Sequence, residues 1–310
     1  MTSGKEKIVI LGTGPCGLGA AWRLQELNYS NVHVFERNSY PGGLASSFQD
    51  DKGFTWDIGG HVQFSHYPYF TEVMDKVMGD QWFTHRRATW IWMKERFIPY
   101  PFQNNIRHLP QKDIDRCIEG LKVAQKGGTL PTTFKEWITT VFGQGIADLF
   151  MIPYNQKVWA YPLKDMSYQW IGERVGVTDL EQVLKSIREE KDDTSWGPNS
   201  TFRFPIKGGT GEIWKRVHDS LPKNTSLLEY NLAGIDPKKK VVAFANGDKE
   251  PYDILISTIP LDILSSLAGL AVPPQLHHSA VHVFGIGMKG TAPLHLNTKS
   301  WIEIPMTLPT

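Results

Sequence analysis

Apolar residues in the first part of the chain follow two different periods in turn. Residues 7–12 (KIVILG) form a continuous β-branched run, residues 18–27 (LGAAWRLQEL) have helical spacing, and residues 31–36 (NVHVFE) form a second apolar run that ends in an acid. Continuous apolar runs are typical of parallel strands that are covered on both faces. The pattern therefore predicts a strand, helix and strand in one unit of about thirty residues.

Two later segments also carry strand patterns. Aromatic and β-branched residues alternate on both sides of Lys94 and Glu95 within residues 88–100 (ATWIWMKERFIPY). This alternation predicts a β-hairpin in a separate antiparallel sheet. Residues 252–260 (YDILISTIP) form a further apolar strand, which we expect to return to the first sheet.

The middle of the chain changes to a helical pattern. Helical spacing interrupted by Gly and Pro predicts helices in residues 112–126, 133–142, 145–159 and 180–190. A strand, a glycine turn and a helix follow in residues 201–221. The predicted fold is α/β, with a discontinuous Rossmann domain of the glutathione-reductase type, an inserted helical domain and an antiparallel β-sheet domain. Their expected ranges are 1–85 with 200–265, 111–199, and 86–110 with 266–310.

The composition is that of an ordinary globular protein. Apolar residues make up 41% and charged residues 21% of the 310 residues, and the formal net charge is +1. Without a basic stripe there is no electrostatic reason to expect nucleic acid or an anionic membrane as a partner. Pro260 and Asp262 interrupt the apolar stretch 254–272, so we expect a buried strand and helix there rather than a membrane span.

Cysteine usage and the N-terminus predict a cytoplasmic protein. Cys16 and Cys117 are far apart and outside any CxxC spacing, which favours free thiols over a disulfide framework or a zinc site. The first strand begins near residue 8, which leaves no room for a signal peptide before it.

A glycine motif follows the first predicted strand. Gly12, Gly14 and Gly17 form GxGxxG between a strand and a helix, and Glu36 ends the second strand. The first glycine permits a tight turn, the second lets backbone amides approach a pyrophosphate, and the third lets the helix pack closely on the sheet. An acid at the end of the second strand accepts hydrogen bonds from ribose hydroxyls. These residues predict a dinucleotide site, to which we also assign Arg37.

A second glycine pair favours FAD over NAD as the dinucleotide. Gly42 and Gly43 follow Glu36 by six residues. Glycines there let the chain pass close to the dinucleotide, and NAD-only folds generally lack them. The next three residues can supply further backbone or side-chain contacts; these residues are Leu44, Ala45 and Ser46.

A third glycine pair precedes two histidines. Gly59, Gly60, His61 and His66 lie within residues 54–70 (FTWDIGGHVQFSHYPYF). Paired glycines permit backbone approach to an isoalloxazine ring, whereas the alternative is a tight loop with two surface histidines. No acid or Cys follows at ligand spacing, so we predict no metal site.

An aromatic cluster at the end of the predicted hairpin is a candidate nucleotide site. Tyr100, Phe102 and Gln103 lie within PYPFQNN. An aromatic pair beside an amide suits a flat heterocycle such as uracil, because it offers a stacking face and hydrogen bonds to the edge. Core packing is the alternative interpretation.

A further cluster lies in the predicted helical domain. It consists of Asn155, Trp159, Trp170 and Arg174, and the last two are spaced i, i+4, which would put them on one helical face. Arg174 can clamp a diphosphate. The alternative is an ion pair with one of two nearby acids, Glu173 or Glu181.

Together these segments carry a family resemblance. The segments are GxGPxGLGAAxRL, PGGLAS, DIGGHVQFSHYPYF, PYPFQNNI, GIADLFMIPYNQKVWA, GERV and WGPNSTFRFPIKGGTGEIW. They closely resemble the eukaryotic type of UDP-galactopyranose mutase, almost without a break to about Trp301. The resemblance extends over loops, which makes it more specific than the glycine motif alone.

The resemblance implies a redox-neutral isomerisation on FAD. UDP-galactopyranose and UDP-galactofuranose would interconvert after NADPH has reduced the flavin, because N5 of the reduced flavin attacks the anomeric carbon. It also implies that segments 171–179 and 195–201 close over the substrate.

Residue roles follow from the same resemblance. Gly59, Gly60 and His61 are similar to a mobile histidine loop at the flavin, and Arg174 is similar to an arginine that binds the diphosphate or sugar. The implied substrate contacts are Tyr100, Phe102 and Gln103 for uridine, together with Phe64, Asn155, Trp159 and Asn199.

The chain also departs from the family pattern. Members of the family are longer, and Glu303 stands where the family has an aromatic residue. We therefore expect a truncated or alternatively spliced form that retains FAD weakly and has little mutase activity. Two other hypotheses stay open: an oxidoreductase of the amine or protoporphyrinogen oxidase class, and a non-catalytic paralogue that only binds a nucleotide or partner. A homo-oligomer is compatible with the sequence.

Overall fold

The described part of the chain forms two compact units. The computed structural model describes residues 5–172, 174–194, 200–271, 276–291 and 293–305. The first unit comprises Met1–Thr84, Arg203–His278 and His282–Gly287. The second comprises His85–Phe202, Ser279–Val281 and Met288–Thr310. The expected division into three domains stays a prediction.

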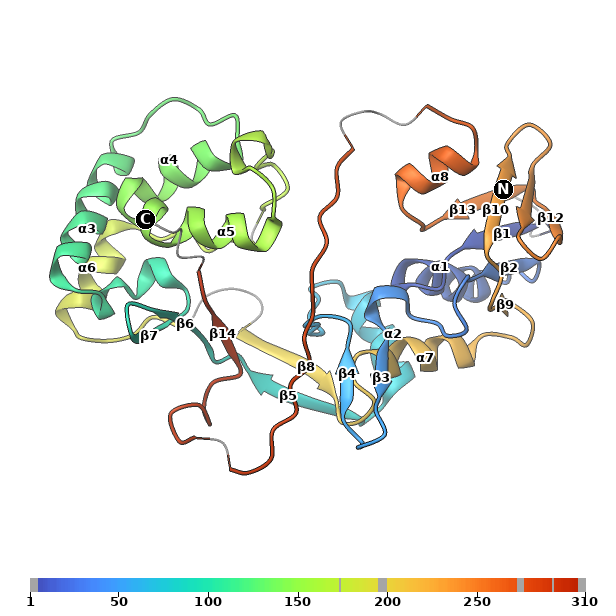
Figure 1. Cartoon of the computed structure of the whole chain (residues 1–310), viewed down its shortest axis with the longest axis horizontal. Helices are drawn as coiled ribbons and strands as arrows, with labels where there is room; N and C mark the ends of the chain where they lie inside the picture. Colours follow the sequence, from blue (N-terminus) through green and yellow to red (C-terminus); the bar gives the residue numbers. More distant parts are fainter. Residues whose placement is uncertain (1–4, 173, 195–199, 272–275, 292, 306–310) are drawn as a thin grey trace. The chain divides into compact units, whose positions relative to one another are not determined.

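A parallel sheet forms the centre of the first unit (Figure 1). Its strands are β13 (Ile254–Ser257), β1 (Ile8–Leu11), β2 (Val32–Phe35) and β9 (Ser226–Leu227), in that order. Ile8 pairs with Val32 on one side and with Ile254 on the other. The predicted strand, helix and strand unit and the predicted returning strand are both confirmed.

Alternate residues of β1 face opposite layers, as the side-chain period of a strand requires. Ile8 and Ile10 pack among helices α1 (Pro15–Glu26), α2 (Pro68–Met78) and α7 (Gly211–Ser220). Val9 and Leu11 pack against a three-stranded antiparallel sheet on the other face. That sheet consists of β10 (Leu232–Asp236), β11 (Val241–Phe244) and β12 (Lys249–Pro251). Because both faces are covered, the continuous apolar run is stabilised by about 1.5–3 kcal/mol for each large side chain buried.

The apolar stretch 254–272 is less buried than expected. β13 is an edge strand of its sheet in the described part of the chain, and Ile254 at its start is 37% exposed. Helix α8 (Leu261–Leu267) follows it with Leu261 56% exposed. The expectation of a buried strand was wrong because β13 has a single neighbouring strand, β1. None of the helices in the described residues is long and apolar enough to cross a membrane.

A short hairpin, which the sequence pattern did not predict, connects the glycine pairs of the first unit. It consists of β3 (Ser47–Gln49) and β4 (Thr55–Asp57), paired antiparallel with Ser47 opposite Asp57. β5 (Trp82–Arg86) and β8 (Thr201–Pro205) form another two-stranded sheet.

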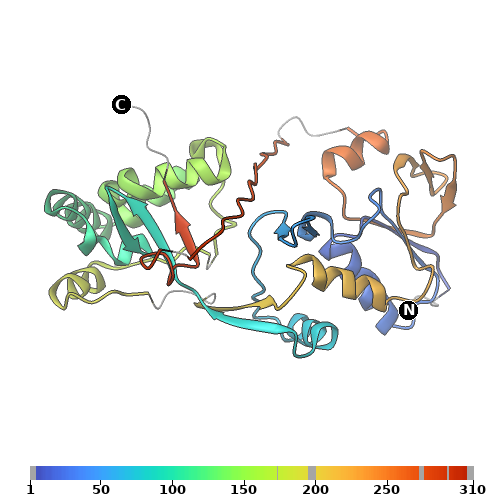
Figure 2. The same ribbon diagram turned by 60° about the horizontal axis from the view of Figure 1, so that its bottom comes forward.

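Helices surround a β-hairpin in the second unit. The hairpin strands are β6 (Thr89–Met93) and β7 (Arg96–Pro99), and β14 (Trp301–Glu303) pairs in parallel with β6. Figure 2 shows the hairpin in teal with β14 in red beside it. Ile91 and Ile98 of the hairpin are fully buried in one core with the helices. The helices are α3 (Gln111–Gln125), α4 (Phe134–Ile146), α5 (Ile152–Trp159) and α6 (Leu180–Arg188).

Local chemistry explains where these elements begin and end. Lys94 and Glu95 both have positive φ, 51° and 58°, which is the geometry of the tight turns that suit the twist of a hairpin. The predicted hairpin and its turn are therefore confirmed. Helix α4 begins where Thr133 and Glu136 form a capping box, in which each side chain accepts a hydrogen bond from the other residue's backbone amide.

Candidate functional site

The GxGxxG residues form an open backbone cradle between β1 and α1. A Cβ atom added to Gly17 would lie 1.9 Å from the carbonyl oxygen of Gly12, so only glycine lets α1 approach the loop this closely. Among the residues that the structure describes, a Cβ on Gly14 would meet nothing within 4 Å, and no side chain caps the N-terminus of α1. The first amides of a helix attract anions when no side chain satisfies them. The geometry therefore suits a pyrophosphate.

Glu36 is held in place by the same loop. Its side chain is 6% exposed, at the end of β2. One carboxylate oxygen accepts hydrogen bonds from the backbone amide and the hydroxyl of Thr13, both at 2.9 Å. The other oxygen accepts one from the amide of Asn38 at 3.0 Å. Arg37, the next residue, is exposed. The carboxylate is thus fixed, and a carboxylate oxygen can accept a further hydrogen bond.

The second glycine pair packs directly on this cradle. The amide of Gly42 donates to the carbonyl of Thr13 at 2.9 Å. A Cβ on Gly43 would lie 3.2 Å from the Cα of Gly14. Ala45 and Ser46 are buried, and Leu44 is exposed. The structure therefore brings both glycine motifs together, although they are about thirty residues apart.

The histidine loop contains a buried polar atom for which the described part of the chain supplies no hydrogen-bond partner. Nδ1 of His61 is inaccessible to solvent and has no hydrogen-bond partner among the described residues. The ring folds toward Gly59, where an added Cβ would lie 3.6 Å from its Cε1 atom. Gly60, between them, is exposed. Buried ring nitrogens are almost always hydrogen-bonded, so this atom suits a ligand that supplies a polar group.

Two other aromatic residues of this segment lie beside the second histidine. The ring of Phe64 is 6.2 Å from that of His66, and the ring of His66 is 4.5 Å from that of Tyr67. No group of three or more His, Cys, Asp or Glu side chains in the described residues could hold a metal ion.

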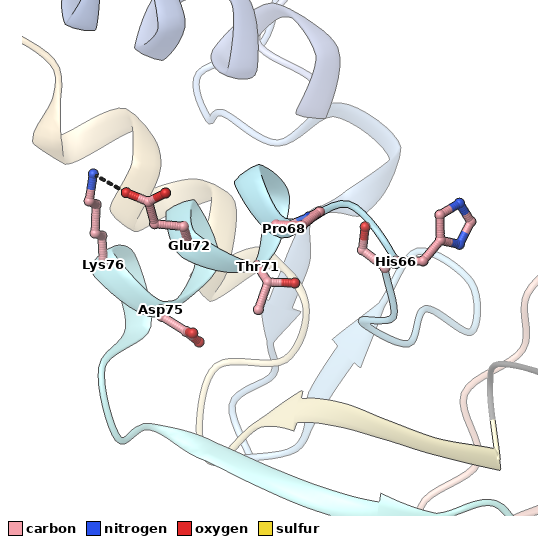
Figure 3. A pocket seen from close by; sticks show the side chains of 7 residues that line it. His66, Pro68, Thr71, Glu72, Asp75 and Lys76 are labelled. Atoms are coloured by element: carbon pink, nitrogen blue, oxygen red, sulfur yellow. Dashed lines mark ion pairs between the residues drawn. The ribbon is translucent and has the colours of Figure 1, made fainter.

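An open depression of about 810 Å³ lies next to His66 along α2 (Figure 3). His66 points away from α2 in this view, and Glu72 pairs with Lys76 at 3.0 Å. Asp75 pairs with Arg203 at 2.5 Å. The charged groups are therefore already neutralised by neighbours, and we assign no part of the site to this depression.

Two residues of the predicted uridine cluster in the second unit, Phe102 and Gln103, are buried by contacts with other residues of that unit. Phe102 is fully buried and stacks on Phe150 with 4.7 Å between ring centroids. Gln103 is 2% exposed, and its amide donates to the carbonyl of Gly176 at 2.5 Å. The core-packing alternative thus describes Phe102 here, and a uridine contact at either residue stays a prediction.

Tyr100 lies at the edge of that cluster. The guanidinium carbon of Arg87 lies 5.1 Å from the centre of its ring, in a cation–π contact. Burial raises the pKa of the Tyr100 hydroxyl above its ordinary value. Tyr100 is therefore neutral at physiological pH and can donate or accept a hydrogen bond.

Asn155 and Trp159 lie on α5 and are joined by a side-chain hydrogen bond. The Asn155 amide donates to the carbonyl of Met151 at 2.8 Å, and the indole of Trp159 donates to the amide oxygen of Asn155 at 3.2 Å. The rings of Trp159 and Trp170 meet edge to face at 4.8 Å. The structure therefore brings three of the four predicted residues into one cluster.

The fourth residue, Arg174, also belongs to this cluster, but not by the predicted helical geometry. Residues 166–179 contain turns and no helix in the described structure, and Gly172 has φ of +50°, so the i, i+4 helical face is wrong. A positive φ ends a helix instead of continuing it. Arg174 still reaches Trp170, because Nη1 donates to its carbonyl oxygen at 2.8 Å.

Arg174 keeps donors available for an anion. Its side chain is exposed, and no carboxylate among the described residues pairs with it. Of the two predicted alternative partners, Glu173 lies outside the described residues, as does the predicted substrate residue Asn199. A guanidinium has five N–H donors, so the bond to Trp170 leaves most of them for other groups.

Sequence reasoning missed Thr13, Asp57 and Thr210. Thr13 holds Glu36, and Asp57 accepts hydrogen bonds from both the amide and the hydroxyl of Thr210. Asp57 lies two residues before Gly59 of the Gly59–Gly60 pair, and Thr210 lies in a glycine turn before α7. A polar residue next to each glycine turn was the available signal.

Comparison with known proteins defines the class. The sequence profile of the family described as flavin containing amine oxidoreductase matches residues 15–305. The chain therefore belongs to this family of flavoproteins, and the predicted α/β flavoprotein fold is confirmed.

Within this class the chain is a homologue of UDP-galactopyranose mutase. The chain is 42% identical in sequence to a protein whose crystal structure is described as reduced UDP-galactopyranose mutase. The match covers 97% of this chain and 68% of that chain, with a TM-score of 0.88. A CLA-producing fatty acid isomerase from P. acnes is 16% identical over 87% of this chain and 63% of its own, with a TM-score of 0.60. A putrescine oxidase bound to putrescine is 18% identical over 85% and 60%, with a TM-score of 0.57. The last two are similar in fold alone.

Proposed function

We propose that this chain carries the FAD-binding and substrate-binding residues of a UDP-galactopyranose mutase, which interconverts UDP-galactopyranose and UDP-galactofuranose. One observation supports this most strongly: the 42% identity to reduced UDP-galactopyranose mutase extends over 97% of the chain. It therefore includes the loops on which substrate residues usually lie. The chain spans about two thirds of that relative, so turnover by the chain as it stands is itself part of the proposal.

The first unit would hold FAD. The open amides at Gly14 and the α1 N-terminus would bind the pyrophosphate, Glu36 the ribose, and the Gly42–Gly43 turn the adjoining backbone. Nδ1 of His61, which has no partner in the described part of the chain, fits the polar edge of a bound ring. Reduced FAD, which we expect NADPH to generate, would supply the nucleophile that takes the anomeric carbon from UDP.

The second unit would hold the nucleotide sugar. Arg174 would donate to the diphosphate, where negative charge increases as the bond to the sugar breaks. Tyr100, Asn155 and Trp159 would line the same cleft, with Phe102 and Gln103 supporting it from the core. Because Gln103 is buried and donates to the carbonyl of Gly176, uridine would reach it only if the segment around Gly176 moved.

A direct assay tests the proposal. The FAD-loaded chain is reduced with dithionite under anaerobic conditions, UDP-galactofuranose is added, and UDP-galactopyranose is quantified by chromatography. We expect product that is absent without dithionite, since only reduced flavin is nucleophilic. Bound, reducible FAD together with no interconversion would contradict the mutase assignment.

An amine oxidase-like oxidoreductase is the second candidate. The match of residues 15–305 to the flavin containing amine oxidoreductase family favours it. An oxidase would produce hydrogen peroxide from amines in air, and a peroxidase-coupled assay with a panel of amines measures this. The mutase proposal expects no peroxide above the rate of free FAD.

A further inference from the structure

A cluster of three polar side chains lies between the histidine loop and the N-terminus of α7. The carboxylate of Asp57 accepts hydrogen bonds from the backbone amide of Thr210 at 3.2 and 3.3 Å and from its hydroxyl at 3.0 Å. It also accepts one from the hydroxyl of Ser47, whose oxygen in turn accepts from the amide of Gly211 at 2.7 Å. The backbone amides of Thr210 and Gly211, at the start of α7, thus donate to side chains of the β3–β4 hairpin.

The backbone approach at this cluster excludes other residues at one position. A Cβ on Gly209 would lie 2.1 Å from a carboxylate oxygen of Asp57 and 2.6 Å from the hydroxyl oxygen of Ser47. The φ of Gly209 is also +64°. The glycine turn before α7 is therefore built around the Asp57 carboxylate, and a negative charge at a helix N-terminus is stabilising.

Asp57 is also the residue from which the histidine loop starts. The amide of Ile58 donates to the carbonyl of Ser46 at 3.2 Å, and the amide of Gly59 donates to the carbonyl of Asp57 at 3.0 Å. These bonds fix the first turn of the loop that ends at His61. The side chain of Asp57 therefore fixes the loop to α7, while its main chain begins the loop.

The same cluster is joined to the dinucleotide cradle through Ser46. Its hydroxyl donates to the carbonyls of Pro41 and Gly43, at 3.0 and 2.8 Å. Gly43 packs on Gly14, as described above. Hydrogen bonds and close backbone packing thus connect the pyrophosphate cradle to the base of the histidine loop, entirely within the first unit.

We propose that Asp57 is a positioning residue that holds the Ile58–His61 loop in register with the flavin by anchoring it to the N-terminus of α7. This inference rests on the proposed function only in assigning the loop to the flavin. Asp57 touches neither cofactor nor substrate in this assignment. It acts through the backbone of Gly59 and Gly60, whose carbonyl groups would accept the hydrogen of N5 in the reduced flavin.

The test compares Asp57→Asn with Asp50→Asn in the full chain. Asp50 lies at the other end of the same hairpin and also accepts three hydrogen bonds, from Lys52, Phe54 and Trp56. Each substitution removes the negative charge and replaces one accepting oxygen by an NH2 donor, at opposite ends of one element. Thr210→Val and Thr210→Ser supply a second pair of variants. Only valine removes the hydroxyl group from which Asp57 accepts a hydrogen bond.

Two measurements decide the outcome, and the first needs no flavin. In the apo chain, hydrogen exchange of the amides of residues 58–61 should accelerate by about tenfold in Asp57→Asn and Thr210→Val, as expected for the loss of a charged hydrogen bond. It should not change in Asp50→Asn or Thr210→Ser. Equal exchange in all four variants would overturn the anchoring role.

The second measurement is the midpoint potential of bound FAD. Asp57→Asn should lower it, equivalent to a roughly fivefold to tenfold weaker preference for reduced over oxidised FAD, because the loop would no longer present its carbonyl groups to N5. Asp50→Asn should match the wild type. An unshifted potential in Asp57→Asn, with accelerated exchange, would show that the anchored loop does not serve the flavin. A wild-type chain that binds no FAD would instead overturn the proposed function.

Discussion

The two units present their candidate site residues in opposite ways. In the first, the backbone amides at Gly14 are open and Nδ1 of His61 has no partner among the described residues. In the second, backbone carbonyls accept from Gln103 and Asn155, and Asn155 accepts from Trp159. Of the predicted residues that the structure describes there, Arg174 is the exposed one with donors to spare. The first unit thus has the preformed geometry that our proposal of a resident cofactor requires. The second resembles a site that a substrate must open.

The largest expected effect comes from filling the preformed cradle. Gly17→Val should abolish FAD binding and destabilise the chain by about 3 kcal/mol or more, because its Cβ would lie 1.9 Å from the carbonyl oxygen of Gly12. FAD titration and thermal unfolding measure both losses.

Gly19→Ala is the matched control for Gly17→Val. Gly19 lies in the same helix, and no atom of the described residues is within 4 Å of an added Cβ, so alanine should stabilise the chain by up to about 1 kcal/mol. Normal FAD affinity in Gly17→Val would show that the dinucleotide does not lie in this cradle.

The next effect concerns the exposed arginine of the second unit. Arg174→Ala should lower kcat/KM for UDP-galactofuranose by about tenfold to a thousandfold, since charged hydrogen bonds contribute about 1.5 to 4 kcal/mol. Steady-state kinetics on dithionite-reduced protein measures it. Arg188→Ala, which removes an exposed guanidinium from the last turn of α6, should leave kcat/KM unchanged. Wild-type kinetics in Arg174→Ala would remove this residue from the site.

The reactivity of the two free thiols should differ in the same way between the two units, because Cys16 in the first unit is exposed and Cys117 in the second is buried. Cys16 is exposed at the start of α1, whereas burial, with a smaller contribution from Asp113, raises the pKa of Cys117 to about 12. At pH 8 Cys117 is therefore almost wholly neutral, and its reaction with a disulfide reagent should be at least about tenfold slower than that of Cys16. FAD should protect Cys16 and not Cys117. Equal rates for both thiols would show that the core of the second unit opens readily.

The smallest effect is a pH dependence in the second unit. Burial of Asp192 opposes ionisation, but hydrogen bonds from His108 and Arg107 outweigh it and lower the pKa of the carboxyl group below its ordinary value. A lowered folded-state pKa stabilises the fold above the unfolded value of about 3.9, and this contribution is lost as the pH falls through the folded value.

Asp192→Asn tests this contribution. The substitution should lower the melting temperature by about 2 °C at pH 7, because the pair is partly exposed, and the difference from the wild type should vanish in acid. A difference that persists well below pH 3 would indicate that the bonds do not depend on the charge.

Local sequence patterns predicted the elements that neighbouring residues determine, in both units, but not the contacts between residues far apart in the chain. The strand at Ile8–Leu11, the glycine turn and helix α1 are determined by residues close in sequence, as is the Lys94–Glu95 turn. The contact between Asp57 and Thr210 joins residues 153 positions apart, so no local period could indicate it. Spacing also misled at Trp170 and Arg174, because Gly172 turns the chain where a helix was expected. Whether Phe102 faced the core or a ligand depended on Phe150, which lies far along the chain.

The central claim is that the first unit is preformed for FAD, and calorimetric titration tests it most directly. FAD added to the purified apo chain should bind at one site per chain, at least about a hundredfold more tightly than NAD, and Gly17→Val should remove this binding. Equal affinity for FAD and NAD, or no binding of FAD by the wild-type chain, would contradict the account.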